Sequence, residues 1–356
     1  MKKSLIIPSV VGALALAIAG CATPTSPSAG PSASVTPIDY KACMVSDSGG
    51  FDDKSFNETA YAGLTRAKNE LGVQTGEVQS KTNADYAQNI KAMLDAKCNL
   101  IITVGFNLGT ATEKAAAANP DVDFAIVDYS YTKPTANLKG LVFNTGEPSF
   151  MAGYLAASLT KSGKVGTFGG AEYPSVTAFM SGYAQGVEYY NKAKSKSVQV
   201  LGWDLKNPKG GTFIASGNFE DVAGGKQVAT NLVAQGADIV LPVAGPAGEG
   251  SLQLAQASNG KVASMWVDTD GCISQEKYCP VIPSSVGKAM DVAVFDTIKS
   301  AIDGGFNNEA YVGTLANGGA YLAPFHDWDS KVSAETKTEL DQIKADIISG
   351  KIKVAS

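Results

Sequence analysis

ACMVSDSGGFDDKSFN, residues 42–57, joins an apolar strand to the start of a helix through a loop with two glycines. Residues 42–46 form a short apolar run, as expected of a buried strand, and residues 58–71 carry apolar side chains at roughly helical spacing. Gly49 and Gly50 permit a turn that brings backbone N–H groups towards a bound molecule, and Ser55 or Asn57 can cap the helix. The stretch therefore predicts a strand–loop–helix unit with a ligand site in its loop.

The loop itself carries more aromatic and acidic side chains than a turn requires. Two rings, Phe51 and Phe56, stand beside the carboxylates of Asp47, Asp52 and Asp53. Aromatic rings stack on planar molecules and carboxylates accept hydrogen bonds, so this mixture suits a planar ligand that has donors. The alternative is a capped loop with one buried phenylalanine.

Strand-like and helical runs alternate along the chain, first over residues 43–143 and again over residues 150–268. Repeated strand–helix order predicts parallel sheets with helices on both faces, here as two similar halves in tandem. A further helix is expected over residues 288–302, with Lys288 at its start.

In such sheets, ligands bind beyond the carboxyl ends of the strands. Asp128 and Asp268 each end an apolar run, where a charge has no packing role. Gly, Asn and Asp are common in any loop of this kind, so the prediction depends on the set and not on one member. Two further candidates do not lie at the carboxyl end of an expected strand: Phe219, an exposed ring in the acidic segment GNFED, and Lys288.

The N-terminus predicts an exported lipoprotein. Lys2 and Lys3 precede an apolar run that ends in IAGC, residues 18–21, which is too short for a membrane-spanning helix and is typical of a secretory leader. Its end resembles the lipobox of bacterial lipoproteins, in which the cysteine, here Cys21, is lipidated and becomes the mature N-terminus. We therefore expect a signal peptide over residues 1–20 and a flexible tether, rich in Ser and Pro, over residues 21–38. An ordinary exported protein, in which Cys21 is only a small residue, is the alternative.

Charge and residue types limit the functions of the chain. Without Lys2 and Lys3 the chain holds 27 basic and 34 acidic residues, a net charge of −7, and it has no basic cluster, which argues against nucleic-acid binding. His326 is the only histidine and no serine lies in a GxSxG motif, so a catalytic triad is unsupported. No phosphate-binding loop and no CxxC pair is present, so we expect no cofactor and no metal.

Four cysteines remain once Cys21 is set aside, and an even number in an exported chain indicates disulfides, with three possible pairings. Cys43 and Cys98 each begin an expected strand, so their starts approach bonding distance if these strands are parallel neighbours. Cys272 and Cys279 would then close a loop of their own.

Taken together, these features resemble the basic membrane protein family, the substrate-binding lipoproteins of ABC importers, whose best understood members bind purine nucleosides. The resemblance covers residues 40–326 and is carried by the lipobox, DSGGFDDKSFN, Asp128, GNFED, Ala244-Gly245, WVDTD and SVGK. It implies an α/β fold of the type I periplasmic-binding-protein class, with two doubly wound parallel-sheet lobes joined by a three-segment hinge. The implied lobes are residues 39–146 plus 281–308 and residues 147–280 plus 309–356.

The resemblance also implies roles for individual side chains. Phe56 and Phe219 match the two rings that enclose a base, while Phe51 and Asp52 are left with structural roles. Asp53 stands where many relatives have Asn, and Phe219 where many have Trp. Asp270 is a rival to Asp268, because the match across that short loop can shift by two residues. The implied ligand-binding residues are Asp47, Asp53, Phe56, Asn57, Asp128, Phe219, Gly245, Asp268, Asp270 and Lys288.

The sequence therefore predicts a lipid-anchored, extracytoplasmic binding protein, not an enzyme, that delivers adenosine, guanosine or inosine to the permease of an ABC importer. Three alternatives stay open. The site can serve a sugar or a flavin-like ligand, the chain can be a ligand-sensing lipoprotein without an importer, or the aspartates can form a nucleoside hydrolase.

Overall fold

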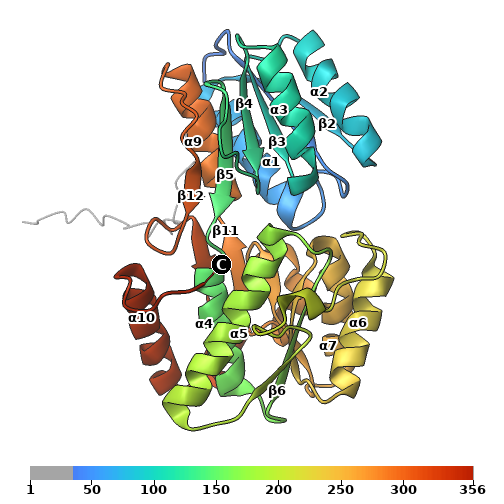
Figure 1. The fold of residues 1–356 in the computed structure, drawn as a ribbon, viewed down its shortest axis with the longest axis vertical. Coiled ribbons are helices and arrows are strands. Elements are labelled where there is room, and N and C mark those ends of the chain that lie inside the picture. The colour runs from blue at the N-terminus through green and yellow to red at the C-terminus, as the bar shows by residue number, and fades with distance from the viewer. Residues whose placement is uncertain (1–34, 356) are drawn as a thin grey trace, which may run out of the picture. The chain divides into compact units, whose positions relative to one another are not determined.

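The first lobe is built on a six-stranded sheet in which every neighbouring pair of strands is parallel, in the order β12-β5-β4-β3-β1-β2 (Figure 1). The computed structural model describes residues 35–355, so the predicted leader and the lipidated Cys21 lie outside the described residues. The strands are β1 (Lys41–Ser46), β2 (Gln74–Gln79), β3 (Leu100–Val104), β4 (Asp123–Val127), β5 (Leu138–Phe143) and β12 (Tyr311–Gly313). The helices are α1 (Phe56–Leu71), α2 (Tyr86–Asp95), α3 (Gly109–Ala118) and α9 (Met290–Ile302).

Both faces of this sheet are buried, and successive side chains of a strand pack on opposite faces. Met44 of β1 packs with Leu64 of α1 and Val294 of α9, whereas its neighbour Val45 packs with Ile90 of α2 on the opposite face. Successive side chains of a strand point to opposite faces, so a strand covered on both sides must be apolar throughout. This explains why the inner strands β1, β3 and β4 are largely apolar, whereas β2 (QTGEVQ), at the edge of the sheet, is not.

The second lobe contains two sheets that meet at a bend. The four-stranded sheet has the order β7-β6-β8-β9 and the three-stranded sheet the order β10-β11-β13. Met265, between β9 and β10, donates its N–H to Val240 O of β8 at 2.8 Å, which continues the pairing across the bend. The strands are β6 (Lys164–Gly169), β7 (Gln199–Leu201), β8 (Ile239–Val243), β9 (Ala263–Ser264), β10 (Trp266–Asp268), β11 (Ser285–Lys288) and β13 (Ala320–Leu322).

Helices cover both faces of the second lobe. They are α4 (Gly146–Leu159), α5 (Pro174–Lys194), α6 (Val222–Ala234), α7 (Glu249–Ala257), α8 (Gly271–Ser274) and α10 (Ala334–Ile348). Helix α4 is buried along most of its length and packs closely on α5. A Cβ at Gly153 would lie 2.0 Å from Tyr183 O, so only glycine allows the two helices to approach so closely. Among residues 35–355, no helix is long and apolar enough to cross a membrane.

The chain passes between the lobes three times: from β5 to α4, from β11 to α9, and from β12 to β13. This is the α/β fold with a three-segment hinge that the resemblance implies, except that one pair in the second lobe, β11 with β13, is antiparallel.

Two short strands differ from the expected lobe boundaries. Strand β11 pairs with β10 and β13 of the second lobe, although residues 281–308 are expected in the first. Strand β12 pairs with β5 of the first lobe, although residues 309–356 are expected in the second. The expectation that Lys288 opens a helix is also wrong, because Lys288 ends β11 and α9 begins at Met290. Strands of three or four residues carry no periodicity of their own, so only their distant partners identify them.

Both disulfides follow the predicted pairing. Cys43 in β1 bonds to Cys98, which lies just before β3, with their Cα atoms 5.9 Å apart. Strands β1 and β3 are parallel neighbours; their register places Cys43 opposite Ile101, and Cys98, in the segment that leads into β3, is near enough to reach Cys43. Cys272 bonds to Cys279 and closes a short loop after β10, with a Cα separation of 4.5 Å.

Candidate functional site

A cavity of about 290 Å³ lies where the loops after β1, β3 and β4 of the first lobe meet the loops after β8 and β10 of the second. These are the carboxyl ends of parallel strands, where α/β proteins place their ligands. The cavity is near the lower end of the size range of small-molecule pockets. The predicted site residues that line it are Asp47, Asp53, Phe56, Asn57, Asp128, Phe219, Gly245, Asp268 and Lys288.

Asp53 organises the loop between β1 and α1. Its Oδ1 accepts hydrogen bonds from the N–H groups of Ser55 at 2.9 Å and Glu58 at 3.0 Å, and its Oδ2 accepts from Asn57 N–H at 2.9 Å. The carboxylate thus satisfies N–H groups at the start of α1 that have no partner within the helix. Ser55, one of the two predicted candidates, occupies the N-cap position, but its side chain makes no capping hydrogen bond; the carboxylate of Asp53 accepts from the N–H groups instead.

Asn57 connects the two aspartates of the loop and keeps one acceptor free. Its Nδ2 donates to Asp47 Oδ1 at 3.0 Å, to Ser48 O at 3.3 Å and to Asp53 Oδ2 at 3.3 Å. Three acceptors around one nitrogen determine the orientation of the amide. Its Oδ1 is buried and has no hydrogen-bond partner among residues 35–355. Since an unpaired buried acceptor is unfavourable, this oxygen suits a donor from a bound molecule.

Lys288 lies at the centre of a buried charge cluster. Its Nζ donates to Asp128 Oδ2 at 2.7 Å and forms an ion pair with Asp268 Oδ1 at 2.9 Å, while only 3% of its side chain is exposed. Ser55 Oγ donates to the other oxygen of Asp268 at 3.1 Å. The cluster therefore joins loops of both lobes beneath the cavity.

Asp128 and Asp268 both adopt left-handed backbone conformations, with φ of 64° and 70°. Residues other than glycine rarely take positive φ, although aspartate does so more often than most. Backbone strain of this kind is concentrated at functional sites, where the surrounding structure holds it in place. Here it turns each carboxylate towards Lys288 at the end of its strand.

Burial changes the protonation of these groups. It raises the pKa of Asp47 to about 7, with the charges of Asp53, Asp128 and Glu220 acting in the same direction and the hydrogen bond from Asn57 acting against it. Burial likewise raises the pKa of Asp53 to about 6, opposed by its backbone hydrogen bonds.

The pKa values of Asp128 and Lys288, at the floor of the cavity, are also shifted. Burial raises the pKa of Asp128, and the nearby Lys288 offsets part of that rise. Burial alone would lower the pKa of Lys288, but the two carboxylates hold it above its usual value. The lysine is therefore charged and already neutralised by its neighbours.

Aromatic rings from both lobes line the cavity. Phe56, at the start of α1, has Lys288 Nζ 4.6 Å from its ring centre. Phe219 comes from the loop before α6, where its carbonyl accepts from Ala247 N–H at 2.7 Å. A Cβ at Gly170 would lie 2.5 Å from the Phe219 ring, so that glycine makes room for it. Phe51, as predicted, has a structural role, since it is buried and stacks on Tyr61 with ring centres 4.6 Å apart.

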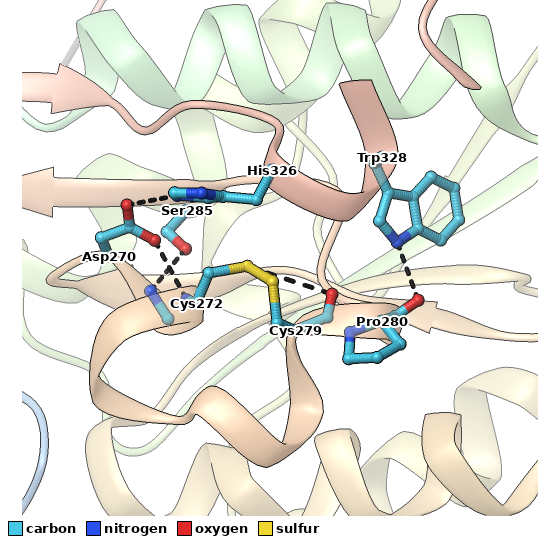
Figure 2. Close-up of a disulfide and its surroundings, with 8 residues drawn as sticks. Asp270, Cys272, Cys279, Pro280, Ser285, His326 and Trp328 are labelled. Carbon is cyan, nitrogen blue, oxygen red and sulfur yellow. Dashed lines mark hydrogen bonds and ion pairs between the residues drawn. A yellow bond between two sulfur atoms is a disulfide. The ribbon is translucent and has the colours of Figure 1, made fainter. Parts of the chain in front are cut away.

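Asp270 is the one predicted ligand residue that does not line this cavity. Its carboxylate accepts from Cys272 N–H at 3.0 Å and lies 2.7 Å from His326 Nε2; Figure 2 shows both contacts as dashed lines. It therefore caps helix α8 and connects that helix to the segment after β13. Cys272 lies close by but is bonded to Cys279, so it offers no thiolate to a metal. Between the two rivals, the structure brings Asp268 to the cavity and not Asp270.

Further residues outside the predicted ligand-binding set also line the cavity. Phe106 and Asn107 follow β3, Tyr173 precedes α5, and Phe179 lies one turn into that helix with Lys288 Nζ 5.5 Å from its ring centre. The strand-end rule points to Phe106 and Asn107. No local signal marks Tyr173, because aromatic residues at the start of a helix are common.

Comparison with known proteins identifies relatives across nearly the whole chain. The family described as ABC transporter substrate-binding protein PnrA-like (Bmp) matches residues 40–356. The chain is 31% identical to basic membrane protein A of Borreliella burgdorferi over 313 residues, which cover 86% of each chain. It is also 31% identical over 376 aligned positions to the ABC transporter nucleoside-binding protein BmpA of Lactococcus lactis, with both chains fully covered.

Among solved structures, an ABC transporter solute-binding protein from Aeropyrum pernix K1 has a TM-score of 0.78 and 26% identity, covering 88% of this chain and 92% of that one. Its fold agrees with the predicted periplasmic-binding-protein class. The relatives are substrate-binding proteins, and the match extends through every strand that borders the cavity. The chain belongs to the PnrA-like (Bmp) family of ABC transporter substrate-binding proteins.

Proposed function

We propose that the chain binds a purine nucleoside in this cavity. The observation that carries the proposal is that Phe56 and Phe219, from opposite lobes, line one cavity together with several carboxylates. A purine between two rings gains about 1–3 kcal/mol of stacking from each, and carboxylates accept from ribose hydroxyls and base N–H groups. The name of the Lactococcus lactis relative, a nucleoside-binding protein, supports the same class of ligand.

The charges of the cavity favour a nucleoside over a nucleotide. Its lining includes the carboxylates of Asp47, Asp128, Glu220 and Asp268 and two lysines: Lys288 is buried and already paired with two of these carboxylates, and Lys81 is exposed to solvent. A phosphate would enter a negative field without a free buried partner among the described residues, which costs several kcal/mol by desolvation and repulsion. A neutral ligand rich in donors fits the acceptors that line the walls.

In the cell, we infer, the domain is held at the outer face of the membrane by a lipid on Cys21, with residues 21–38 as the tether. The two lobes, with β11 assigned to the second and β12 to the first, close on the nucleoside. Ligand then shifts an open–closed equilibrium by its difference in affinity for the two forms. The closed form is what the permease of an ABC importer recognises, so binding leads to import.

The affinity for a purine nucleoside is expected to rise about tenfold between pH 6 and pH 8. The pKa of Asp47 is about 7, and only its carboxylate form accepts a donor without competition from its own proton. At pH 6 most Asp47 is protonated, and binding must first remove that proton. Calorimetric titration with inosine at both pH values measures this, and Asp47→Asn is expected to give weaker binding that hardly varies with pH.

The stability of the ligand-free protein is expected to fall as pH rises, opposite to the affinity for the nucleoside. A carboxyl group whose pKa is raised by folding binds more protons in the folded state, so its contribution to stability is lost as pH rises from about 4 to about 7. Urea unfolding at pH 5 and pH 8 is expected to show this decrease in wild type and a smaller decrease in Asp47→Asn. A wild-type affinity that stays flat from pH 6 to pH 8 contradicts the role of Asp47.

A thermal-shift panel tests the proposed ligand class. We expect adenosine, guanosine or inosine to raise the melting temperature, and ribose, uridine and inosine monophosphate to have little effect. Stabilisation grows with ligand concentration above Kd, so comparison at 1 mM ranks the ligands. A shift with ribose alone would favour a sugar-binding protein, and release of free base on incubation would favour a hydrolase.

A further inference from the structure

A row of aromatic rings crosses the rim of the cavity from one lobe to the other. Phe106 of the first lobe stacks on Tyr173 of the second, with ring centres 5.1 Å apart and planes 19° from parallel. Tyr173 in turn stacks on Phe219 at 6.0 Å and 22°. Three nearly parallel rings thus form one stack, and all three line the cavity.

A hydrogen bond joins the same two lobes beside this stack. Asn107 Nδ2 donates to Tyr173 Oη at 2.9 Å, across 66 residues of sequence. Stacking and the hydrogen bond require the same placement of the tyrosine ring, so each contact supports the other.

Both sides of this contact are held by their own lobe. On the first lobe, Phe106 packs on Tyr129 at 5.0 Å, and Tyr129 packs on Tyr131, whose hydroxyl donates to Gly109 O at 2.8 Å. On the second lobe, Tyr173 O accepts from Val176 N–H at 2.9 Å at the start of α5. The rings therefore need little reordering when the lobes meet, which strengthens the contact.

We propose that Phe106, Asn107 and Tyr173 form a latch that holds the two lobes together over the ligand and sets how slowly it leaves. The inference rests on the proposed closure over a nucleoside and adds the residues that maintain it. Tyr173 also acts as a positioning residue, because it supports the outer face of Phe219, one of the rings proposed to stack on the base. The charge cluster of Lys288 lies at the floor of the cavity, and the latch lies at its rim.

Stopped-flow kinetics tests the latch with the chain from Val35 onward, which forms one compact unit. The probe is the fluorescent purine nucleoside 2-aminopurine riboside. Tyr173→Ala removes both contacts that cross between the lobes, the stack on Phe106 and the hydrogen bond from Asn107. This loss is expected to raise the dissociation rate about tenfold, with an association rate within about twofold of wild type. Tyr173→Phe keeps the stack and loses the hydrogen bond, so it is expected to raise the dissociation rate about threefold.

A double-mutant cycle separates the latch from simple packing. In the Tyr173→Phe background, Asn107→Ala is expected to have no further effect on dissociation, because the partner hydroxyl is already gone. Tyr189→Ala, on helix α5 that follows Tyr173 and 36% exposed, is the control and is expected to leave both rates unchanged. Additive effects of the two changes, or a Tyr173→Ala dissociation rate equal to wild type, would overturn the latch.

Small-angle X-ray scattering of the ligand-free chain provides a test that needs no nucleoside. Tyr173→Ala is expected to increase the radius of gyration relative to wild type, because the open form becomes more populated. An unchanged radius overturns the latch. If wild type binds no purine nucleoside, the proposed function fails while the scattering comparison still decides the latch, so the two failures are distinguishable.

Discussion

Lys288→Met is expected to lower the free energy of unfolding by about 3–5 kcal/mol at pH 8, because removal of one partner leaves the others as uncompensated buried charges. Asp128 and Asp268 lose the ammonium that lies 2.7 and 2.9 Å from them, and the side chains of both are only 9% exposed. Urea unfolding followed by circular dichroism measures the change. The same substitution is expected to abolish measurable nucleoside binding, because repulsion drives the two aspartates apart at the floor of the cavity.

Lys351→Met is the matched control. Lys351 also pairs with an aspartate, Asp346 at 2.9 Å, but 71% of its side chain is exposed. Exposed pairs contribute about 0–1 kcal/mol, so this variant is expected to unfold close to wild type. The defect of Lys288→Met is also expected to shrink at lower pH, because burial raises the pKa of Asp128 and its carboxyl group can take up a proton. A loss below about 1 kcal/mol at pH 8 would contradict the importance of the buried cluster.

Phe56→Ala and Phe219→Ala are each expected to weaken the binding of a purine nucleoside by about 10- to 100-fold. Stacking of a base on one ring contributes about 1–3 kcal/mol, and about 1.4 kcal/mol corresponds to a factor of ten. The two rings come from opposite lobes, so each substitution removes one side of the proposed base site. Calorimetric titration with inosine measures the affinity, and titration with ribose is expected to show no matching loss.

Phe51→Ala is the control for these substitutions. Phe51 lies in the same loop as Phe56 but is buried against Tyr61 and does not line the cavity. Its truncation is expected to lower stability by about 3–5 kcal/mol while the folded fraction keeps its affinity. If Phe56→Ala loses less than about threefold in affinity, its stacking role is wrong.

The sequence predicts most of the fold because long strands and helices carry their own periodicity. Residues 124–127 of strand β4, for example, form a continuous apolar run that Asp128 follows directly, and both features can be recognised without a structure. Strands β11 and β12 are different, since each has only three or four residues and depends on pairing with segments far along the chain. Their assignment to the wrong lobe, and of Lys288 to a helix, follows from that lack of local signal.

The same distinction separates the parts of the site that can be predicted from those that cannot. Asp47 follows a strand and Asp268 ends one, and both break an apolar pattern, so they can be recognised locally. Asp270 satisfies the same local criteria, but its contact with His326 depends on a segment 56 residues further along. The contact between Asn107 and Tyr173 likewise exists only in three dimensions. Sequence patterns therefore identify candidates, while long-range contacts decide which of them face the ligand.

The central claim is that one purine nucleoside binds between the two lobes. Calorimetric titration of the chain from Val35 onward with adenosine, guanosine, inosine, uridine and ribose tests it most directly. The account predicts binding of at least one purine nucleoside with one site per chain and much weaker binding of uridine and ribose. Absence of binding to all three purine nucleosides would contradict it.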